Sequence, residues 1–375
     1  MAQKYSNFHN ILKEKFQDDA DGLSFIESQL FGRPCETFES SFDDELNCEV
    51  AHDKFEGQSS IGGKRMVKIA AIQNSIPADT TLPIDEQLRI NVDRIFALTK
   101  KACEEGAQII CLQEACSAPF FFCLREKWPW TQFAEDYIEG PTVSRFYELS
   151  RDYKNVIILP ILERAQHDII WNTAVILEDG EVLGRTRKSH IPRIGDFNEG
   201  TYYRYDRNMK FPVFKTKFGN VAVQICYARH FPLCWEAYAI NGAEFIFNPS
   251  ATVDGLSESL WPIEARSGAV ANSVYTIAIN RIGTEHYESE FTSGNGKPAH
   301  KDFGHFYGSS FVTAPNSHRT PSLSRDKDGI LIVDCDLNII KQVRDVWNFQ
   351  MAHRREDYAE LLAASVDPEF QPNIQ

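Results

Sequence analysis

Cys226 is the residue with the clearest potential for chemistry. It follows a short apolar run and precedes Tyr-Ala-Arg-His, in which the small Ala228 suits a tight turn from a strand into a helix. A thiol presented at such a turn, beside backbone N–H groups, has the accessibility that a nucleophile needs and the donors that stabilise an oxyanion. Most isolated cysteines are instead small apolar core residues, so the position of Cys226 alone favours a structural thiol.

Two charged residues occupy similar places in the sequence. Glu114 follows the apolar segment Ile-Ile-Cys-Leu-Gln, and Lys188 follows a predicted hairpin strand. A carboxylate in apolar surroundings can have a raised pKa and act as a base, and a lysine can supply positive charge to an oxyanion. Taken singly, each also fits a plainer interpretation: a strand-end carboxylate in water, and a solvated basic cluster with Arg185 and Arg187.

We expect neither a metal nor another cofactor. His300 and His305 lie too far apart to ligate from one helical turn, and no His-Glu-x-x-His sequence occurs. The Gly294-Asn-Gly-Lys sequence lacks the spacing of a phosphate-binding loop and indicates a turn. Lys188 already offers the positive charge that a metal would otherwise bring to an oxyanion.

Positioning these residues requires a scaffold, and the sequence predicts one of the α/β class. Strand-length apolar segments alternate with helix-length amphipathic segments, with hairpins inserted between them. The predicted helices cover residues 86–105, 143–153, 232–241, 257–272 and 358–364. The predicted strands cover residues 67–73, 108–113, 156–161, 171–177, 182–187, 220–226, 244–249, 275–280, 309–313 and 330–334. This order favours two mixed sheets with helices on their outer faces.

The N-terminal part differs from this pattern. Two short amphipathic segments, which begin at Phe8 and Leu23, precede acidic and polar sequence. Residues 1–60 hold 13 acidic and 5 basic residues, a net charge of −8 out of −14 for the whole chain. We therefore predict a helical extension and linker over residues 1–65, and one domain with a C-terminal tail over residues 66–375.

Composition excludes several classes of protein. With 375 residues, 43% of them hydrophobic, the chain can bury a sizeable core, and its net charge of −14 disfavours a nucleic acid partner. No run approaches 18 uncharged apolar residues, and the N-terminus lacks the apolar region of a signal peptide, so we expect no membrane association. The nine cysteines are odd in number and form no Cys-x-x-Cys, which favours free thiols and a cytoplasmic location.

Glu114, Lys188 and Cys226, in this order, resemble the catalytic set of the nitrilase, or carbon–nitrogen hydrolase, superfamily. Longer motifs resemble its β-ureidopropionase family over residues 66–360, and the acidic extension also suits that family. These motifs are Gln113-Glu-Ala, Arg125-Glu-Lys, Trp171-Asn-Thr-Ala-Val, His190-Ile-Pro-Arg-Ile-Gly-Asp-Phe-Asn-Glu, Phe247-Asn-Pro-Ser-Ala-Thr, Trp261-Pro-Ile-Glu-Ala-Arg, Asn280-Arg-Ile-Gly-Thr-Glu and Phe306-Tyr-Gly-Ser-Ser.

The resemblance implies a fold and a catalytic set. The fold would be a four-layer αββα sandwich of the nitrilase type with a helical N-terminal extension. Cys226 would be the nucleophile and Glu114 the general base. Lys188 would stabilise the oxyanion together with the backbone N–H of Tyr227, and Glu199 matches the second active-site glutamate of the family.

The same resemblance implies a substrate. The family cleaves N-carbamoyl-β-alanine and N-carbamoyl-β-aminoisobutyrate to the β-amino acid, CO2 and ammonia, the last step of reductive pyrimidine degradation. Arg125 and His230 match positions that hold the substrate carboxylate, and Ser257 is a further candidate. Members of the family assemble, so we expect a homo-oligomer that binds a small carbamoyl amino acid.

The sequence departs from the family pattern near the predicted site. The family's Trp, Met, Ala, Gly and His are replaced here by Cys116, Ala118, Phe121, Ala228 and Phe231. These changes leave the catalytic class intact and open a second possibility, an amidohydrolase for another carbamoyl amino acid or a carboxylated amide. A third possibility is a non-catalytic assembly paralogue, which the presence of the complete catalytic set disfavours.

Overall fold

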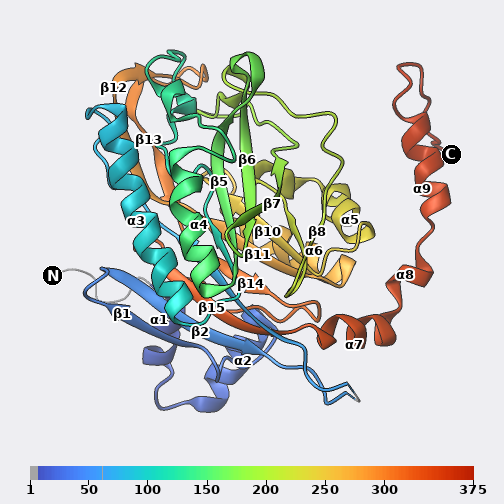
Figure 1. Cartoon of the computed structure of the whole chain (residues 1–375). Helices are drawn as coiled ribbons and strands as arrows, with labels where there is room; N and C mark the ends of the chain where they lie inside the picture. Colours follow the sequence, from blue (N-terminus) through green and yellow to red (C-terminus); the bar gives the residue numbers. More distant parts are fainter. Residues whose placement is uncertain (1–6, 61) are drawn as a thin grey trace.

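The structure, a computed structural model, describes residues 7–60 and 62–375. Two sheets form its centre (Figure 1). The large sheet has the order β1 (Glu39–Asp43), β2 (Cys48–Phe55), β15 (Gly329–Asp336), β3 (Met66–Gln73), β4 (Ile109–Leu112), β5 (Val156–Arg164), β6 (Ile170–Glu178) and β7 (Glu181–Arg187). The small sheet has the order β14 (Phe311–Thr313), β11 (Tyr275–Asn280), β10 (Phe245–Ser250), β9 (Gly219–Val223) and β8 (Phe214–Thr216). A separate hairpin consists of β12 (Ile282–Phe291) and β13 (His300–Tyr307).

Helices cover the outer face of each sheet, which gives four layers. α3 (Ile84–Glu104) and α4 (Pro141–Tyr153) lie on the large sheet, and α5 (Pro232–Ile240) and α6 (Trp261–Asn272) on the small one (Figure 1). A third core lies between the sheets, where Ile69 of β3 and Phe247 of β10 belong to one apolar cluster. The predicted four-layer αββα sandwich is confirmed.

The alternation of side chains along a strand explains why the central strands are apolar on both faces. In β3, Ile69 and Ala71 face the core between the sheets, whereas Ala70 and Ile72 face α3. Successive side chains of a strand point to opposite faces, so a strand that is buried on both sides must be apolar throughout. Strands of this kind were therefore the easiest elements to predict.

The description of residues 1–65 as helical extension and linker is wrong after residue 31. α1 (Phe8–Lys15) and α2 (Ala20–Phe31) are present, but β1 and β2 follow, and β2 pairs in parallel with β15. The acidic residues that suggested a linker have specific partners: Glu49 accepts hydrogen bonds from Asn7 and Ser40. Residues 1–6 and 61 lie outside the described part, and the domain boundary at residue 65 stays a prediction.

The C-terminal segment reaches away from the body (Figure 1). It contains α7 (Asn338–Trp347), α8 (Phe349–Ala352) and α9 (Arg355–Ala364), of which only the last matches a predicted helix. Many of its apolar side chains are exposed, including Trp347 at 64% and Met351 at 82%.

All nine cysteines of the chain are free and buried. Within the described residues no helix has the length and apolar character needed to cross a membrane.

Candidate active site

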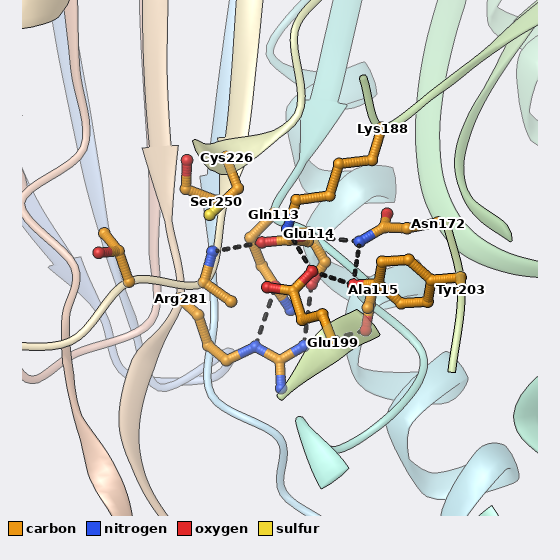
Figure 2. Close-up of polar contacts among 12 residues, drawn as sticks. Gln113, Glu114, Ala115, Asn172, Lys188, Glu199, Tyr203, Cys226, Ser250 and Arg281 are labelled. Atoms are coloured by element: carbon orange, nitrogen blue, oxygen red, sulfur yellow. Dashed lines mark hydrogen bonds and ion pairs between the residues drawn. The ribbon is translucent and has the colours of Figure 1, made fainter. Parts of the chain in front are cut away.

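The structure brings three of the predicted catalytic residues into direct contact. Glu114 follows β4, Lys188 follows β7, and Glu199 begins the short 3₁₀ turn η4 (Glu199–Thr201). Lys188 Nζ lies 2.7 Å from Glu114 Oε1 and 2.6 Å from Glu199 Oε2, and all three side chains are buried (Figure 2). We call these three residues the acidic cluster, because two carboxylates share one ammonium group.

The Glu114 carboxylate is fixed by donors on both oxygens. Asn172 Nδ2 donates to Oε1 at 2.7 Å, and the backbone N–H of Ala251 donates to Oε2 at 2.9 Å. The backbone after it turns sharply, since Ala115 has a φ of 48°, a conformation that costs free energy for a residue other than glycine. Arg281 stabilises this turn by donating to the carbonyl oxygens of Glu114 and Ala115 at 2.9 and 3.0 Å.

The charged groups of the acidic cluster shift one another's pKa. Burial alone would lower the pKa of Lys188, but Glu114 and Glu199 outweigh it and raise the pKa above its ordinary value. Burial raises the pKa of Glu199, helped by the Glu114 charge and opposed by Lys188 and the Tyr203 hydroxyl. Lys188 therefore stays charged, and Glu199 keeps its proton to a higher pH than an exposed glutamate does.

Cys226 lies beside this cluster at the start of the turn η5 (Cys226–His230), three residues after β9 ends. Its φ of 47° is again unusual for a residue other than glycine, which marks the tight turn that the sequence predicted. The strand ends earlier than predicted, and the thiol is only 4% exposed. Burial, with Glu114 nearby, raises the pKa of this thiol to about 11, although Lys188 and Arg229 lower it. The thiol is therefore protonated at neutral pH and needs a base to become a nucleophile.

One wall of a small cavity is formed by Cys226. The cavity has a volume of about 220 Å³, well above the minimum of about 10–15 Å³ that a single water molecule needs on this measure. Its lining includes Tyr227, His230 and Ser257, three of the residues that the sequence assigned to the site. The apolar part of the wall includes Phe197. The cavity thus admits a small molecule up to the thiol.

Arg229 and His230 line this cavity and both contact Glu264, and we call these three residues the basic cluster. Arg229 Nε lies 3.2 Å from Glu264 Oε2, and His230 Nδ1 lies 2.6 Å from Glu264 Oε1. The Arg229 guanidinium also donates to Ser257 Oγ at 2.9 Å and lies 3.8 Å from Cys226 Sγ. A buried guanidinium beside a hydroxyl is a suitable receptor for a carboxylate.

Arg125 is not part of this cavity. It is exposed and lines a neighbouring pocket of about 510 Å³, which shares only Ile194 and Phe197 with the first. Among the described residues it forms no ion pair, so it does not pair with Glu126 or Glu135 either. In this conformation of the chain, Arg125 is therefore separated from Cys226 by the turn that contains Ile194 and Phe197.

The substituted positions lie behind the cavity rather than in it. They are Cys116, Ala118, Phe121, Ala228 and Phe231, and within the described chain none of them lines the cavity. Phe121 belongs to an aromatic core that also contains Phe197, and Phe231 stacks on His190 with ring centroids 3.9 Å apart. The substituted positions are therefore near the cavity without lining it: Ala228 lies between the lining residues Tyr227 and Arg229, and Phe121 shares a core with the lining residue Phe197.

Several residues of the site escaped the sequence analysis. They are Asn172, Tyr203, Arg229, Glu264 and Arg281. Arg229 could have been found, because it follows the nucleophile by three residues and so lies on the same turn. The others come from separate elements, and polar residues in buried strands or helices carry no local signal of their partner.

The structure also offers a test of the metal prediction. Within residues 7–60 and 62–375, His9, Glu27 and Cys35 are the one group of His, Cys, Asp or Glu residues close enough to share an ion. They belong to the N-terminal extension, and Glu27 already accepts hydrogen bonds from His9 Nε2 at 2.7 Å and from the Cys35 N–H at 2.8 Å. This group therefore has a structural explanation without an ion.

Comparison with known proteins identifies the family. Residues 68–345 match the family of carbon-nitrogen hydrolases. The chain belongs to this family. It is 51% identical to a β-ureidopropionase of Arabidopsis thaliana over 83% of this chain and 76% of that protein. It is 32% identical to an N-carbamoylputrescine amidase of Solanum tuberosum over 80% of this chain and 95% of that protein.

The fold agrees with that of a solved carbon–nitrogen hydrolase. A protein of this family from Helicobacter pylori G27 superposes with a TM-score of 0.68 at 24% identity, over 79% of this chain and 98% of that one. The present carbon–nitrogen hydrolase is thus an enzyme of the nitrilase superfamily, with the resemblance inferred from its motifs confirmed.

Proposed function

We propose that this carbon–nitrogen hydrolase is a cysteine amidohydrolase that cleaves N-carbamoyl-β-alanine and N-carbamoyl-β-aminoisobutyrate to the β-amino acid, CO2 and ammonia, the last step of reductive pyrimidine degradation. The observation that carries this proposal is the position of the Cys226 thiol, beside the acidic cluster and on the wall of a cavity that contains the Arg229 guanidinium. The identity of 51% with the Arabidopsis enzyme supports the same substrate class.

In the first half of the proposed reaction, Cys226 attacks the ureido carbon. Glu114 takes the thiol proton, and Lys188 and the Tyr227 N–H hold the oxyanion, each donor contributing on the order of 3 kcal/mol in the transition state. The bond to the terminal nitrogen then breaks, and that nitrogen takes the proton from Glu114 and leaves as ammonia. The rest of the substrate, a carbamoyl group that still carries the β-amino acid on its nitrogen, remains on the sulfur of Cys226 as a thiocarbamate.

Water completes the reaction. Glu114 removes a proton from the water molecule as its oxygen attacks the carbamoyl carbon, and the carbon–sulfur bond breaks. The sulfur takes the proton back, and the released carbamate loses CO2 to give the β-amino acid. A thiol with a pKa of about 11 explains why a fixed base is needed in the first step.

For the substrate carboxylate we propose the basic cluster as receptor. Arg229 and Ser257 lie on the cavity wall 2.9 Å apart, and His230 borders the same space. The family resemblance assigns this task to Arg125. In the described conformation Arg125 lines the adjacent pocket, where its charge attracts the substrate as the substrate approaches.

A second candidate keeps the chemistry and changes the substrate to another carbamoyl amino acid or a carboxylated amide. N-carbamoylputrescine, the substrate named for the Solanum tuberosum relative, carries an ammonium group that the Arg229 guanidinium would repel. Ammonia release from a panel of N-carbamoyl-β-alanine, an α-amino acid analogue, an uncharged ureido analogue and N-carbamoylputrescine separates these candidates. A protein that turns over none of them would be the non-catalytic paralogue.

The decisive variant is Cys226→Ala. We expect no detectable turnover with an unchanged thermal unfolding midpoint, and in the wild type a mass increase on Cys226 equal to the substrate minus ammonia when the reaction is quenched. Cys234→Ala is the matched control, since Cys234 is equally buried in α5. Activity of the Cys226→Ala variant close to that of the wild type would refute the mechanism.

We also propose that catalysis needs no metal. Lys188 carries the charge that a Lewis acid would supply to an oxyanion. Prolonged chelation followed by assay should leave turnover unchanged. A loss of activity that zinc restores would contradict this proposal.

We propose further that the protein acts as a homo-oligomer in the cytoplasm. A groove of about 1020 Å³, lined by α2, α6 and the C-terminal segment, exposes apolar side chains such as Ile263 at 64%. Its cations, Arg266 and Arg319, complement the acidic and apolar residues 356–370 of a second copy. Deleting residues 348–375 should lower the mass measured by analytical ultracentrifugation.

The nine free buried thiols support the proposed cytoplasmic location, because thiols stay free in a reducing compartment.

A further inference from the structure

A second bridge connects the two carboxylates of the acidic cluster, besides Lys188. Asn172 Nδ2 donates to Glu114 Oε1 at 2.7 Å and to the Tyr203 hydroxyl oxygen at 3.1 Å. The Tyr203 hydroxyl in turn donates to Glu199 Oε2. Figure 2 shows this path from Glu114 through Asn172 and Tyr203 to Glu199. All four side chains are buried, so water does not compete for these contacts.

The bridge has a fixed direction. A tyrosine hydroxyl has one proton, and an asparagine NH2 group can only donate. Because Asn172 donates to the Tyr203 oxygen, the Tyr203 proton is directed at Glu199. Asn172 therefore determines which way the tyrosine donates.

The two oxygens of Glu199 differ as a result. Oε2 accepts from both Tyr203 and Lys188, whereas Oε1 is buried and has no hydrogen-bond partner within residues 7–60 and 62–375. An oxygen that accepts two donors is a poor place for a proton. When Glu199 is protonated, its proton therefore resides on Oε1.

We propose that Tyr203 is a positioning residue that tunes the proton affinity of Glu199 and reserves Oε1 as the proton-carrying oxygen, with Asn172 setting the direction of the hydroxyl. This role rests on the proposed function, because it assigns Glu199 a proton that matters for turnover. Tyr203 itself touches no substrate in this scheme and acts through Glu199.

The groups that face Glu199 predict the effect of removing the hydroxyl. Burial and the charge of Glu114 raise the pKa of Glu199, and Lys188 and the Tyr203 hydroxyl lower it. The Cys226 thiol beside the acidic cluster is neutral near pH 7 and adds no charge. Loss of the hydroxyl therefore raises the pKa of Glu199, whichever protonation state is the active one.

The test compares two adjacent tyrosines. Tyr203→Phe deletes the donor to Glu199, and Tyr202→Phe is the matched control, because the Tyr202 hydroxyl is also buried but donates to backbone carbonyls, including that of Leu124 at 3.1 Å. In pH profiles of kcat, Tyr203→Phe should move the limb that reports Glu199 upward by about one pH unit, with a larger effect on kcat than on KM. Tyr202→Phe should leave the profile in place.

A third variant distinguishes the loss of the hydrogen bond from misfolding of the Tyr203→Phe protein. Replacing Tyr203 by 3-fluorotyrosine keeps the shape and strengthens the donor, so the same limb should move downward. An unmoved profile in a folded, active Tyr203→Phe protein, or equal shifts in both phenylalanine variants, overturns the role of Tyr203. If the wild type turns over none of the carbamoyl substrates, the proposed function fails instead, and the two failures are thereby distinguished.

Discussion

The acidic cluster and the basic cluster both lie near the Cys226 thiol and differ in composition and exposure. Glu114, Lys188 and Glu199 combine two carboxylates with one ammonium group, and each of their side chains is at most 1% exposed. In the basic cluster, the Glu264 carboxylate contacts both the Arg229 guanidinium and the His230 imidazole. The side chains of His230 and Glu264 retain 22% and 17% exposure.

This difference matches two tasks that one cluster could not perform. A base near the thiol requires a carboxylate, which the acidic cluster supplies, whereas a receptor for a carboxylate requires a cationic donor, which Arg229 supplies. The acidic cluster is held by residues that follow β4 and β7 of the large sheet, and the basic cluster by η5 and α6 on the small sheet. The Cys226 thiol at the meeting point of the two sheets has access to both.

The largest effect should come from removing the shared cation. Lys188→Met leaves Glu114 and Glu199 buried without their ion-pair partner, which should cost about 3–5 kcal/mol of unfolding free energy at pH 7 and lower kcat by at least a thousandfold. Denaturant unfolding and steady-state kinetics measure the two losses. The double variant with Glu199→Gln removes the repulsion, so it should regain most of the stability and none of the activity. Equal stability of the two variants would contradict the electrostatic explanation.

The next effect concerns the basic cluster. Arg229→Gln should lower kcat/KM for N-carbamoyl-β-alanine by about a hundredfold or more, since a desolvated carboxylate loses its charged partner. An uncharged ureido analogue of the same length should lose far less. Arg229→Lys, which keeps the charge and loses the fork of donors, should fall between them. If both substrates lose activity equally, Arg229 is structural and supports the turn that carries Cys226.

The two clusters also differ in how far the sequence could predict them. Glu114, Lys188 and Cys226 follow strands in the order that resembles the catalytic set of the superfamily, and this resemblance predicted that they meet. Glu264 and Tyr203 depend on long-range packing of α6 and η4 against the site, for which no spacing in the sequence gives a signal. Family motifs supplied Glu199, which spacing alone did not.

The fold shows the same division. Central strands such as β3 and β5 are apolar on both faces and were predicted almost to their ends. The edge strand β1 and its neighbour β2 were missed, because both contain charged side chains, which an edge strand tolerates. The hairpin of β12 and β13 was missed as well, since its burial alternates with long exposed polar stretches.

A smaller effect should appear in the pH dependence of stability. The pKa of Glu199 is higher in the folded protein than its ordinary value of 4.5. The stability from this group is thus fully present below pH 4.5 and is lost as the pH rises through the raised pKa. Glu199→Gln lacks this loss, so its unfolding free energy relative to the wild type should increase between pH 5 and pH 8 by roughly 1–3 kcal/mol. A pH-independent difference would show that Glu199 is ionised throughout this range.

The smallest effect should come from Arg125, the residue that stands outside both clusters. As an exposed arginine in the neighbouring pocket, it can attract an anionic substrate through solvent but cannot grip it beside Cys226. Arg125→Ala should therefore reduce kcat/KM by less than about tenfold, and added salt should abolish the difference. Arg193→Ala is the matched control, because Arg193 is exposed in the same pocket. A salt-independent loss above a hundredfold, confined to Arg125 and to carboxylated substrates, would instead mean that the segment around residues 123–126 closes over the cavity during turnover. The carboxylate would then be shared between Arg125 and the basic cluster, and the separation of the two pockets would hold only for the open form.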